Sequence, residues 1–507
     1  MRKALLLAAI LSLGLIIRAY RITALPLYGD ELTMVYDSYS ILKTGRDQTG
    51  KFLPITFEMR GQSPGGYVYA SIPFVAIFGP SVLAVRMLSL ISGVGIIILM
   101  YLLGSKFFSQ RTGLIAALLT AISPWEIALS RAGFESHFAL FLTLLGLCFL
   151  LYSESRRWFF IYAGLSWGLA IHTYQTYKLI VLPFLVLTFW YVGIFKRKKI
   201  FSNLFFVLGI VVFGVFLSLV VREILIGRSQ ERFEDINIFA QSGLQEEITQ
   251  KVNFERQVSG LPNVANEIFH NKAIEYSKEL IGGYLQNFSN DFLLLTGDYN
   301  PRHNPAESGA VYLVEVATLF VGIFVLRVKS RKLFQFLILW LLVSPVSGVL
   351  TGEPHFLRNS IMLPPLILLS AYGLPQIKSK YLVGVIVAAI LLQMVFVLER
   401  IYLIAPTQHA GFWSQSARTA SEAAIHKKDD YKKIFLLTKI DNIEYAYPVY
   451  AKIDPSLVIG QSKSGFPKKY GNIAITDKIE DFERGEDVLV ITIDSKNELL
   501  YETGIKK

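Results

Sequence analysis

The chain has 507 residues, a formal net charge of +11 at pH 7, 53% hydrophobic residues and 18% charged residues. Soluble domains carry about 25% charged residues. Here long apolar runs alternate with short basic clusters, which is typical of a multi-span membrane protein and explains the positive charge without nucleic acid as a partner. The single cysteine, Cys148, lies in an apolar run, which excludes an intrachain disulfide and a cysteine-cluster metal site.

The N-terminus combines the basic residues of Met1–Lys3 with the apolar run ALLLAAILSLGLII, as a signal peptide does. No small-residue cleavage site follows, and Arg18, Tyr20 and Arg21 come directly after the run. We therefore expect a retained signal-anchor helix with its N-terminus in the cytoplasm.

A spanning helix needs about 20 mostly apolar residues. The apolar runs predict an all-α polytopic membrane protein with about 11 transmembrane helices. The predicted spans are residues 4–20, 82–103, 113–129, 137–153, 158–174, 179–195, 201–221, 309–327, 333–350, 359–376 and 381–404. The run at 67–79 is shorter and interrupted, so we expect a re-entrant or interfacial segment there.

The basic residues predict the orientation, because cytoplasmic loops are enriched in Lys and Arg. Those in the predicted cytoplasmic loops are Lys106, Arg111, Arg156, Arg157, KRKK at 196–199, RVKSRK at 327–332, Lys378 and Lys380. An odd number of spans then puts the C-terminal part outside. The predicted outer loops are 21–81, 130–136, 174–178, 222–308 and 351–358.

Two domains are predicted, a transmembrane domain at 1–404 and an extracytoplasmic α/β domain at 405–507. Within the second, KKIFLLTKI and EDVLVITID have the apolar composition of β-strands. The stretch FWSQSARTASEAAIHKK has the periodicity of an amphipathic helix.

Adjacent carboxylates follow the first predicted span in the stretch LPLYGDELTMVYDSY. In a partly buried site, one of Asp30 and Glu31 can act as a general base while the other orients it or binds a cation. The alternative is structural: Asp30 caps a helix that starts at Glu31, since Asp is a favoured N-cap.

Two further motifs lie at the predicted outer ends of spans. In SPWEIALSRAGFESH, Arg131 and Glu135 would share one face of a helix, either as an ordinary ion pair beside an interfacial His137 or as part of a site. In GEPHFLRNS, His355 and Arg358 favour anion binding over simple snorkelling of the arginine, because Arg matches phosphate with a planar fork.

The remaining outer motifs are TGDYNPRHNP and HTYQTYK. Arg302 and His303 of the first could add to a phosphate site or belong to a structured loop. Tyr174 and Lys178 of the second favour an aromatic interface belt, with a lipid-phosphate groove as the alternative.

Metal binding is left open by the sequence. Asp30, Glu31, His303 and His355 offer oxygen and nitrogen ligands, but no HExxH, DxD or CxxC spacing is present. We therefore predict no specific cofactor, and a divalent cation stays open.

Together YGDEL, YSILKTGRDQTGKFLP, ISPWEIALSRAGFESHFALF, FSNDFLLLTGDYNPRHNP and EPHFLRNSIMLPPL resemble bacterial family-39-type glycosyltransferases over roughly residues 1–400. These are membrane enzymes of the GT-C class, related to the protein O-mannosyltransferases and the aminoarabinose lipid A transferase. The C-terminal domain is outside the resemblance.

The resemblance implies an inverting transfer of a sugar from a polyprenyl-phosphate donor, on the outer face of a bacterial-type plasma (inner) membrane. It implies Asp30 as the base with Glu31 beside it, Arg131 and Glu135 as residues that orient the loop or the acceptor, and His355 and Arg358 at the lipid phosphate. The acceptor would be a lipid, a protein or a glycan.

The chain departs from the resemblance in GQSPGGY, where Gln62 and Ser63 replace charged residues that relatives often carry and Arg60 is a nearby substitute. Two other functions stay open. A lipid-linked glycan polymerase or ligase would yield a ladder of products. A non-catalytic transporter of lipid-linked sugars would show inverted repeats and charges near the membrane centre, and neither is evident.

Overall fold

The computed structural model describes residues 2–58, 62–196, 198–226, 242–350, 352–478, 487–494, 496 and 498–503. Two compact units are present, each assembled from several stretches of the chain. The unit that we call the bundle unit comprises Met1–Gly14, Val94–Ile127 and Ser136–Val397. The unit that we call the sheet unit comprises Leu15–Gly93, Ala128–Glu135 and Leu398–Lys507.

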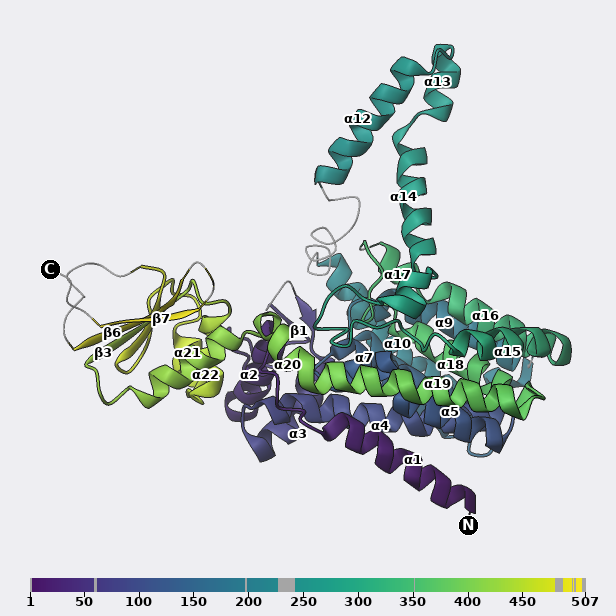
Figure 1. The fold of residues 1–507 in the computed structure, drawn as a ribbon, viewed down its shortest axis with the longest axis horizontal. Helices are drawn as coiled ribbons and strands as arrows, with labels where there is room; N and C mark the ends of the chain where they lie inside the picture. Colours follow the sequence, from purple (N-terminus) through teal and green to yellow (C-terminus); the bar gives the residue numbers. More distant parts are fainter. Residues whose placement is uncertain are drawn as a thin grey trace. The chain divides into compact units, whose positions relative to one another are not determined.

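Apolar helices build the bundle unit (Figure 1). They are α1 (Arg2–Ala19), α4 (Val82–Phe107), α5 (Gln110–Ile122), α6 (Pro124–Ser130), α7 (Glu135–Tyr152), α8 (Phe159–Ile171), α9 (Tyr177–Val192), α10 (Leu204–Leu225), α15 (Glu315–Lys329), α16 (Arg331–Val343), α17 (Val346–Val349), α18 (Leu363–Gly373) and α19 (Lys380–Glu399). Parts of α1, α4 and α6 and end residues of α7 and α19 belong to the sheet unit. Every predicted span coincides with a helix or with adjoining helices of this set, which confirms the predicted fold class.

Within the described residues, five helical stretches are long and apolar enough to cross a membrane by themselves. They are Val82–Phe107, Glu135–Tyr152, Leu204–Leu225, Arg331–Val349 and Lys380–Gln408. The predicted span 113–129 is instead a pair, α5 and α6, bent by 61°. The bend coincides with Pro124, which starts α6 and cannot donate a backbone hydrogen bond to α5.

The long predicted outer loop contains helices of its own, although its residues 227–241 lie outside the described part. Helices α12 (Ser242–Val258), α13 (Asn263–Phe269) and α14 (Lys272–Gln286) form a hairpin that stands out from the bundle helices (Figure 1). Lys251 of α12 pairs with Glu275 of α14 at 2.6 Å. The Tyr284 hydroxyl fixes the base of the hairpin by donating to the carbonyl oxygen of Leu342.

The sheet unit starts with the first outer segment. Helix α2 (Gly29–Thr44) and helix α3 (Gly66–Phe78) are joined through the short antiparallel strands β1 (Thr56–Phe57) and β2 (Ser63–Pro64). The predicted interfacial segment 67–79 is thus largely one helix, with Pro73 inside it. Arg60, named above as a substitute, lies outside the described residues.

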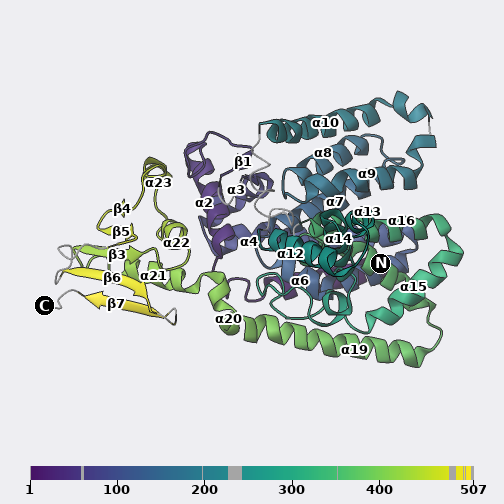
Figure 2. The ribbon, with the colours of Figure 1, turned by 90° about the horizontal axis from the view of Figure 1, so that it is seen from above.

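The C-terminal part of this unit is a five-stranded sheet with helices, as predicted (Figure 2). Its strand order is β4-β5-β3-β6-β7, and the central strand β3 is parallel to β5 and β6. The strands are β3 (Lys433–Leu437), β4 (Lys468–Tyr470), β5 (Ile473–Thr476), β6 (Val488–Ile493) and β7 (Leu499–Thr503). The helices are α20 (Ala405–Gln408), α21 (Gln415–His426), α22 (Ile443–Tyr450) and α23 (Pro455–Gly460).

The first outer segment and the C-terminal residues pack together in the sheet unit. The Tyr36 hydroxyl of α2 donates to the carbonyl oxygen of Ile453 at 3.0 Å. The backbone N–H of Leu27 lies 3.4 Å from the Tyr450 hydroxyl. The boundary at residue 405 therefore stays a prediction, since this unit joins residues from both predicted domains.

Candidate functional site

The adjacent carboxylates of the first outer segment have different environments. Glu31 is fully buried, and its two oxygens each lie 2.7 Å from Arg86, at Nε and at Nη2. The backbone N–H of Gly133 donates to Glu31 Oε1 at 2.7 Å. A carboxylate held by a two-point guanidinium contact and a backbone donor is fixed in orientation.

Arg86 also joins Glu31 to the segment before α2. Its Nη1 donates to the carbonyl oxygens of Ile22 and Leu25 at 2.7 and 2.9 Å, and its Nη2 donates to that of Pro26 at 2.6 Å. The guanidinium lies 5.1 Å from the ring centre of Trp413. This one arginine therefore fixes the approach of the chain to the first turn of α2.

Asp30 is the more exposed member of the pair. It is half-buried in the first turn of α2, which begins at Gly29 with Tyr28 at the N-cap. The structural alternative, a cap at Asp30, is therefore wrong by two positions. An acid in the first turn of a helix still interacts favourably with the helix dipole.

Arg131 holds the end of α1 within the sheet unit. Its Nη1 donates to the carbonyl oxygens of Ile17, Arg18 and Tyr20 at 3.1, 2.9 and 2.7 Å. Its guanidinium lies 4.8 Å from the ring centre of Tyr402. Cations at a helix C-terminus stabilise it, so Arg131 positions the segment that leads to Asp30.

Arg131 and Glu135 do not share a helix face, contrary to the expectation from their spacing. Helix α6 ends at Ser130 and α7 begins at Glu135, with a turn between them. Gly133 lies in that turn, and its N–H is bound to Glu31 instead of to a preceding carbonyl. Glycine is a weak helix former, so the turn at this position is favoured.

A further carboxylate in the first outer segment has an unusual pKa. Asp37 of α2 is buried, and its Oδ1 accepts from the backbone N–H of Gln48 at 3.0 Å. Burial raises the pKa of Asp37 to about 7, although the hydrogen bonds from Gln48 act in the opposite direction.

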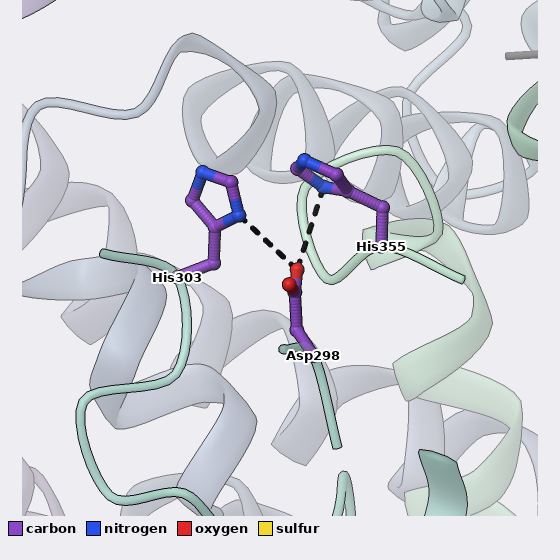
Figure 3. Close-up of side chains that lie close together, drawn as sticks. All are labelled: Asp298, His303 and His355. Carbon is purple, nitrogen blue, oxygen red and sulfur yellow. Dashed lines mark hydrogen bonds and ion pairs between the residues drawn. The ribbon is translucent and has the colours of Figure 1, made fainter. Parts of the chain in front are cut away.

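In the bundle unit, the motifs TGDYNPRHNP and GEPHFLRNS meet at one carboxylate (Figure 3). Asp298 Oδ2 lies 3.1 Å from His303 Nδ1 and 3.5 Å from His355 Nδ1. The backbone N–H of Phe356 donates to the same oxygen at 2.7 Å. The two imidazole ring centres are 4.2 Å apart.

The titration of this cluster follows from its charges. Burial opposes ionisation of Asp298, but hydrogen bonds and the two histidines outweigh it and lower the pKa of the carboxyl. Burial, followed by the neighbouring His303, holds the pKa of His355 well below its usual value, and Arg358 adds to this effect. His355 is therefore neutral at physiological pH.

The cluster fits a divalent cation. One ligand atom from each of Asp298, His303 and His355 lies within 4.8 Å of the others. His355 Nδ1 accepts from the N–H of Leu357 at 3.2 Å while it faces Asp298 Oδ2. Two acceptor atoms at this separation are stabilised by a cation between them, and two imidazoles with one carboxylate suit Zn²⁺ or a similar ion.

Two further motifs attach to the 352–360 loop. Trp125 Nε1 donates to the carbonyl oxygen of Phe356 at 3.0 Å, and the two rings are stacked with centres 4.6 Å apart. The hydroxyls of Tyr177 and Ser360 lie 2.8 Å apart. Within the bundle unit, the structure thus brings the 352–360 motif into contact with Trp125, with Tyr177 and with the 296–305 motif.

The predicted phosphate-binding cations differ in their surroundings. Arg302 and Arg358 are half-buried in the two loops that carry the histidines. Lys178 pairs instead with Glu223 at 2.9 Å, with both side chains largely buried. Tyr174 is half-buried beside Tyr177, with ring centres 6.3 Å apart.

Sequence reasoning missed three members of these arrangements. Arg86 was visible as a lone arginine inside a predicted span, which ordinarily has a buried partner. Asp298 was visible as a carboxylate in the same motif as His303. The third is Glu126, which forms a fully buried pair with His137 at 2.9 Å, so the expected interfacial position of His137 is wrong.

Comparisons with known proteins agree with this fold. Residues 64–221 match the model of the family described as dolichyl-phosphate-mannose-protein mannosyltransferase. A comparison with curated protein sequences gives no significant match.

Among solved structures, the fold is similar to that of ArnT from Cupriavidus metallidurans bound to undecaprenyl phosphate. The TM-score is 0.55 and the identity 11%, over 89% of this chain and 84% of that chain. It is also similar to the Archaeoglobus fulgidus oligosaccharyltransferase tethered with an acceptor peptide, with a TM-score of 0.51 and 15% identity over 89% of this chain and 63% of that chain. For the archaeal enzyme AglB in complex with an inhibitory peptide and a dolichol-phosphate, the TM-score is 0.50 at 15% identity, over 89% of this chain and 64% of that one. The family match thus covers residues 64–221, and the fold of the chain is ArnT-like, of the GT-C type.

Proposed function

We propose that the chain transfers a sugar from a polyprenyl-phosphate-linked donor to an acceptor hydroxyl, with inversion at the anomeric carbon, on the extracytoplasmic face of the membrane. The observation that carries this proposal is that the two adjacent acids, Asp30 and Glu31, differ in burial and in contacts. Glu31 is locked by Arg86, while Asp30, next to it in the first turn of α2, keeps partial exposure to an incoming hydroxyl.

Asp30 is the proposed general base. It removes the proton of the acceptor hydroxyl, and the oxygen attacks the anomeric carbon as the bond from that carbon to the phosphate oxygen breaks. The lipid phosphate leaves with the bonding electrons, and the proton passes from Asp30 to water. Glu31 is a positioning residue, because its oxygens already bind Arg86 and the N–H of Gly133.

The proposed phosphate-binding residues are Arg302 and Arg358, together with His303 and His355. A departing phosphate gathers negative charge, which fixed cations and N–H donors stabilise. Lys178 is neutralised by Glu223, so we assign Lys178 and Tyr174 to holding the turn that Tyr177 joins to Ser360. Arg131 and Glu135 would orient the first outer segment or the acceptor. The contacts of Arg131 with the carbonyl oxygens of Arg18 and Tyr20, just before that segment, support the first role for Arg131.

Asp298, His303 and His355 would hold a divalent cation, which when bound supplies positive charge near a phosphate. Independently of a cation, Asp298 orients the His303 imidazole and the backbone at Phe356 through its contacts with both.

The test is a transfer assay with the purified full chain, radiolabelled polyprenyl-phosphate sugars and candidate lipid, protein and glycan acceptors. We expect a single added sugar per acceptor and release of polyprenyl phosphate in equal amount. A ladder of products would replace this proposal with the polymerase alternative. Movement of intact donor between leaflets without cleavage would replace it with the transporter alternative.

A further inference from the structure

An apolar cavity lies among α7, α8, α9 and α10, which run side by side in the bundle unit (Figure 2). Its volume is about 240 Å³, and none of its lining residues carries a charge. The lining includes Leu150, Phe160, Trp167 and Phe206. A space of this kind accepts a hydrocarbon chain and offers nothing to a polar ligand.

Two glycines shape this cavity. A methyl group on Gly164 of α8 would lie 2.0 Å from the carbonyl oxygen of Gly209 of α10, and one on Gly209 would lie 2.3 Å from that of Phe160. The two backbones therefore touch at this crossing, as small residues allow in membrane helices. Aromatic side chains around the crossing line the cavity.

A second cavity of about 240 Å³ adjoins the first and shares Leu150 and Phe160 with it. It is lined by Lys106 at the end of α4 and Lys332 at the start of α16, with Ser153 and Glu154 after α7. Ile194 and Ile200 also line it.

The two lysines are placed by aromatic rings. Lys106 Nζ lies 5.1 Å from the ring centre of Tyr152, and Lys332 Nζ lies 5.6 Å from that of Tyr191. Tyr191 is itself stacked on Phe336, with ring centres 4.4 Å apart. Cation–π contacts of this kind reduce the freedom of a lysine side chain, so both ammonium groups are held at the cavity.

We propose that the two cavities form one binding site for an anionic phospholipid. An acyl chain occupies the apolar cavity, and the headgroup phosphate lies between Lys106 and Lys332. The site is at the basic ends of the helices, where the predicted cytoplasmic loops are, and basic pockets between membrane helices at that side suit anionic headgroups. This site shares no residue with those proposed above for sugar transfer.

The experiment is native mass spectrometry of the full chain, titrated with phosphatidylglycerol or with phosphatidylcholine of the same acyl chains. We expect the wild-type chain to bind phosphatidylglycerol about 10- to 30-fold more tightly, which corresponds to about 1 kcal/mol for each lysine. The double variant Lys106→Gln/Lys332→Gln is expected to lose this preference.

Two matched variants sharpen the test. Lys380→Gln removes a lysine that also lies over a tyrosine ring, 5.2 Å from that of Tyr381, but does not line either cavity, so it should keep the preference. Glu154→Gln removes the acid of the basic cavity and should strengthen phosphatidylglycerol binding several-fold.

An unchanged preference in the double variant overturns the proposal, as does an equal loss in Lys380→Gln. A third ligand, undecaprenyl phosphate, is titrated in the same way, alone and in competition with phosphatidylglycerol. If it binds through Lys106 and Lys332 and phosphatidylglycerol does not compete, the phospholipid assignment is wrong. Asp30→Asn is expected to bind phosphatidylglycerol like the wild type, so this result and that of the transfer assay are independent.

Discussion

Glu31 and Arg86, which are 55 positions apart in the sequence, form a buried two-point ion pair with both N–O distances at 2.7 Å. Removing one partner of a buried pair leaves an uncompensated charge, which costs about 3–5 kcal/mol. We expect Arg86→Leu to lower the free energy of unfolding by about this amount, measured by thermal unfolding of the purified chain.

The matched control for this pair is Arg418→Leu, because Arg418 and Glu422 form an ion pair at 2.9 Å but are partly exposed. Its loss should be below about 1 kcal/mol. The double variant Arg86→Leu/Glu31→Leu should recover part of the stability. Equal losses of unfolding free energy in Arg86→Leu and Arg418→Leu would show that the buried Glu31–Arg86 pair stabilises the fold no more than an exposed pair.

Asp37 predicts a pH dependence of stability. Its pKa is raised to about 7 by burial, while in the unfolded chain it is close to about 3.9. Its contribution to stability is therefore fully present below about pH 4 and is lost as the pH rises through about 7, by up to about 4 kcal/mol.

Asp37→Asn keeps an oxygen that accepts from the Gln48 N–H but does not ionise. We expect this variant to gain stability relative to the wild type between about pH 5 and pH 8, measured by thermal unfolding across that range. Asp430→Asn, at an exposed position, should follow the wild type. Parallel curves for Asp37→Asn and the wild type would contradict the burial of an ionisable group there.

The Asp298 cluster predicts metal binding that depends on one carboxylate. We expect the purified chain to retain about one Zn²⁺ or similar ion, and Asp298→Asn to bind it at least 10-fold more weakly, measured by elemental analysis and metal titration. His270→Gln is the control, because His270 pairs with Glu255 outside the cluster. Equal metal contents in all three proteins would argue against the site.

The contacts of Trp125 with Phe356 are expected to keep the loop that carries His355 well ordered. Trp125→Phe keeps an aromatic ring against Phe356 but leaves the buried Phe356 carbonyl without its donor, at a cost of about 1–3 kcal/mol. We expect faster hydrogen exchange of the amides at 355–358. Trp190→Phe, at a partly exposed position of α9, should leave the exchange of these amides unchanged. Faster exchange in both variants would show that Trp125 does not specifically order the loop.

The helices could be predicted from the sequence because their signal is local. A run of apolar residues with basic ends defines a membrane helix without reference to any partner, and KKIFLLTKI and EDVLVITID define β3 and β6 in the same way. The bend at Pro124 divides one predicted span into α5 and α6, which run length alone does not reveal.

The site could be predicted only in part, because its pairings are not local. His303 and His355 were singled out by type and predicted side of the membrane, but the carboxylate that joins them lies 58 positions from Phe356, which it also binds. Arg131 and Glu135 had the spacing of a helical pair, yet the turn at Gly133 separates them because its N–H serves Glu31. Such choices depend on tertiary contacts that no window of sequence contains.

Sugar transfer with Asp30 as the base is tested most directly by single-turnover rates at saturating donor and acceptor, for wild type, Asp30→Asn and the surface control Asp430→Asn. A general base contributes about 100- to 10,000-fold. We therefore expect Asp30→Asn to bind the donor as the wild type does but to transfer sugar at least 100-fold more slowly, with Asp430→Asn unaffected. Transfer by Asp30→Asn at the wild-type rate would contradict the account.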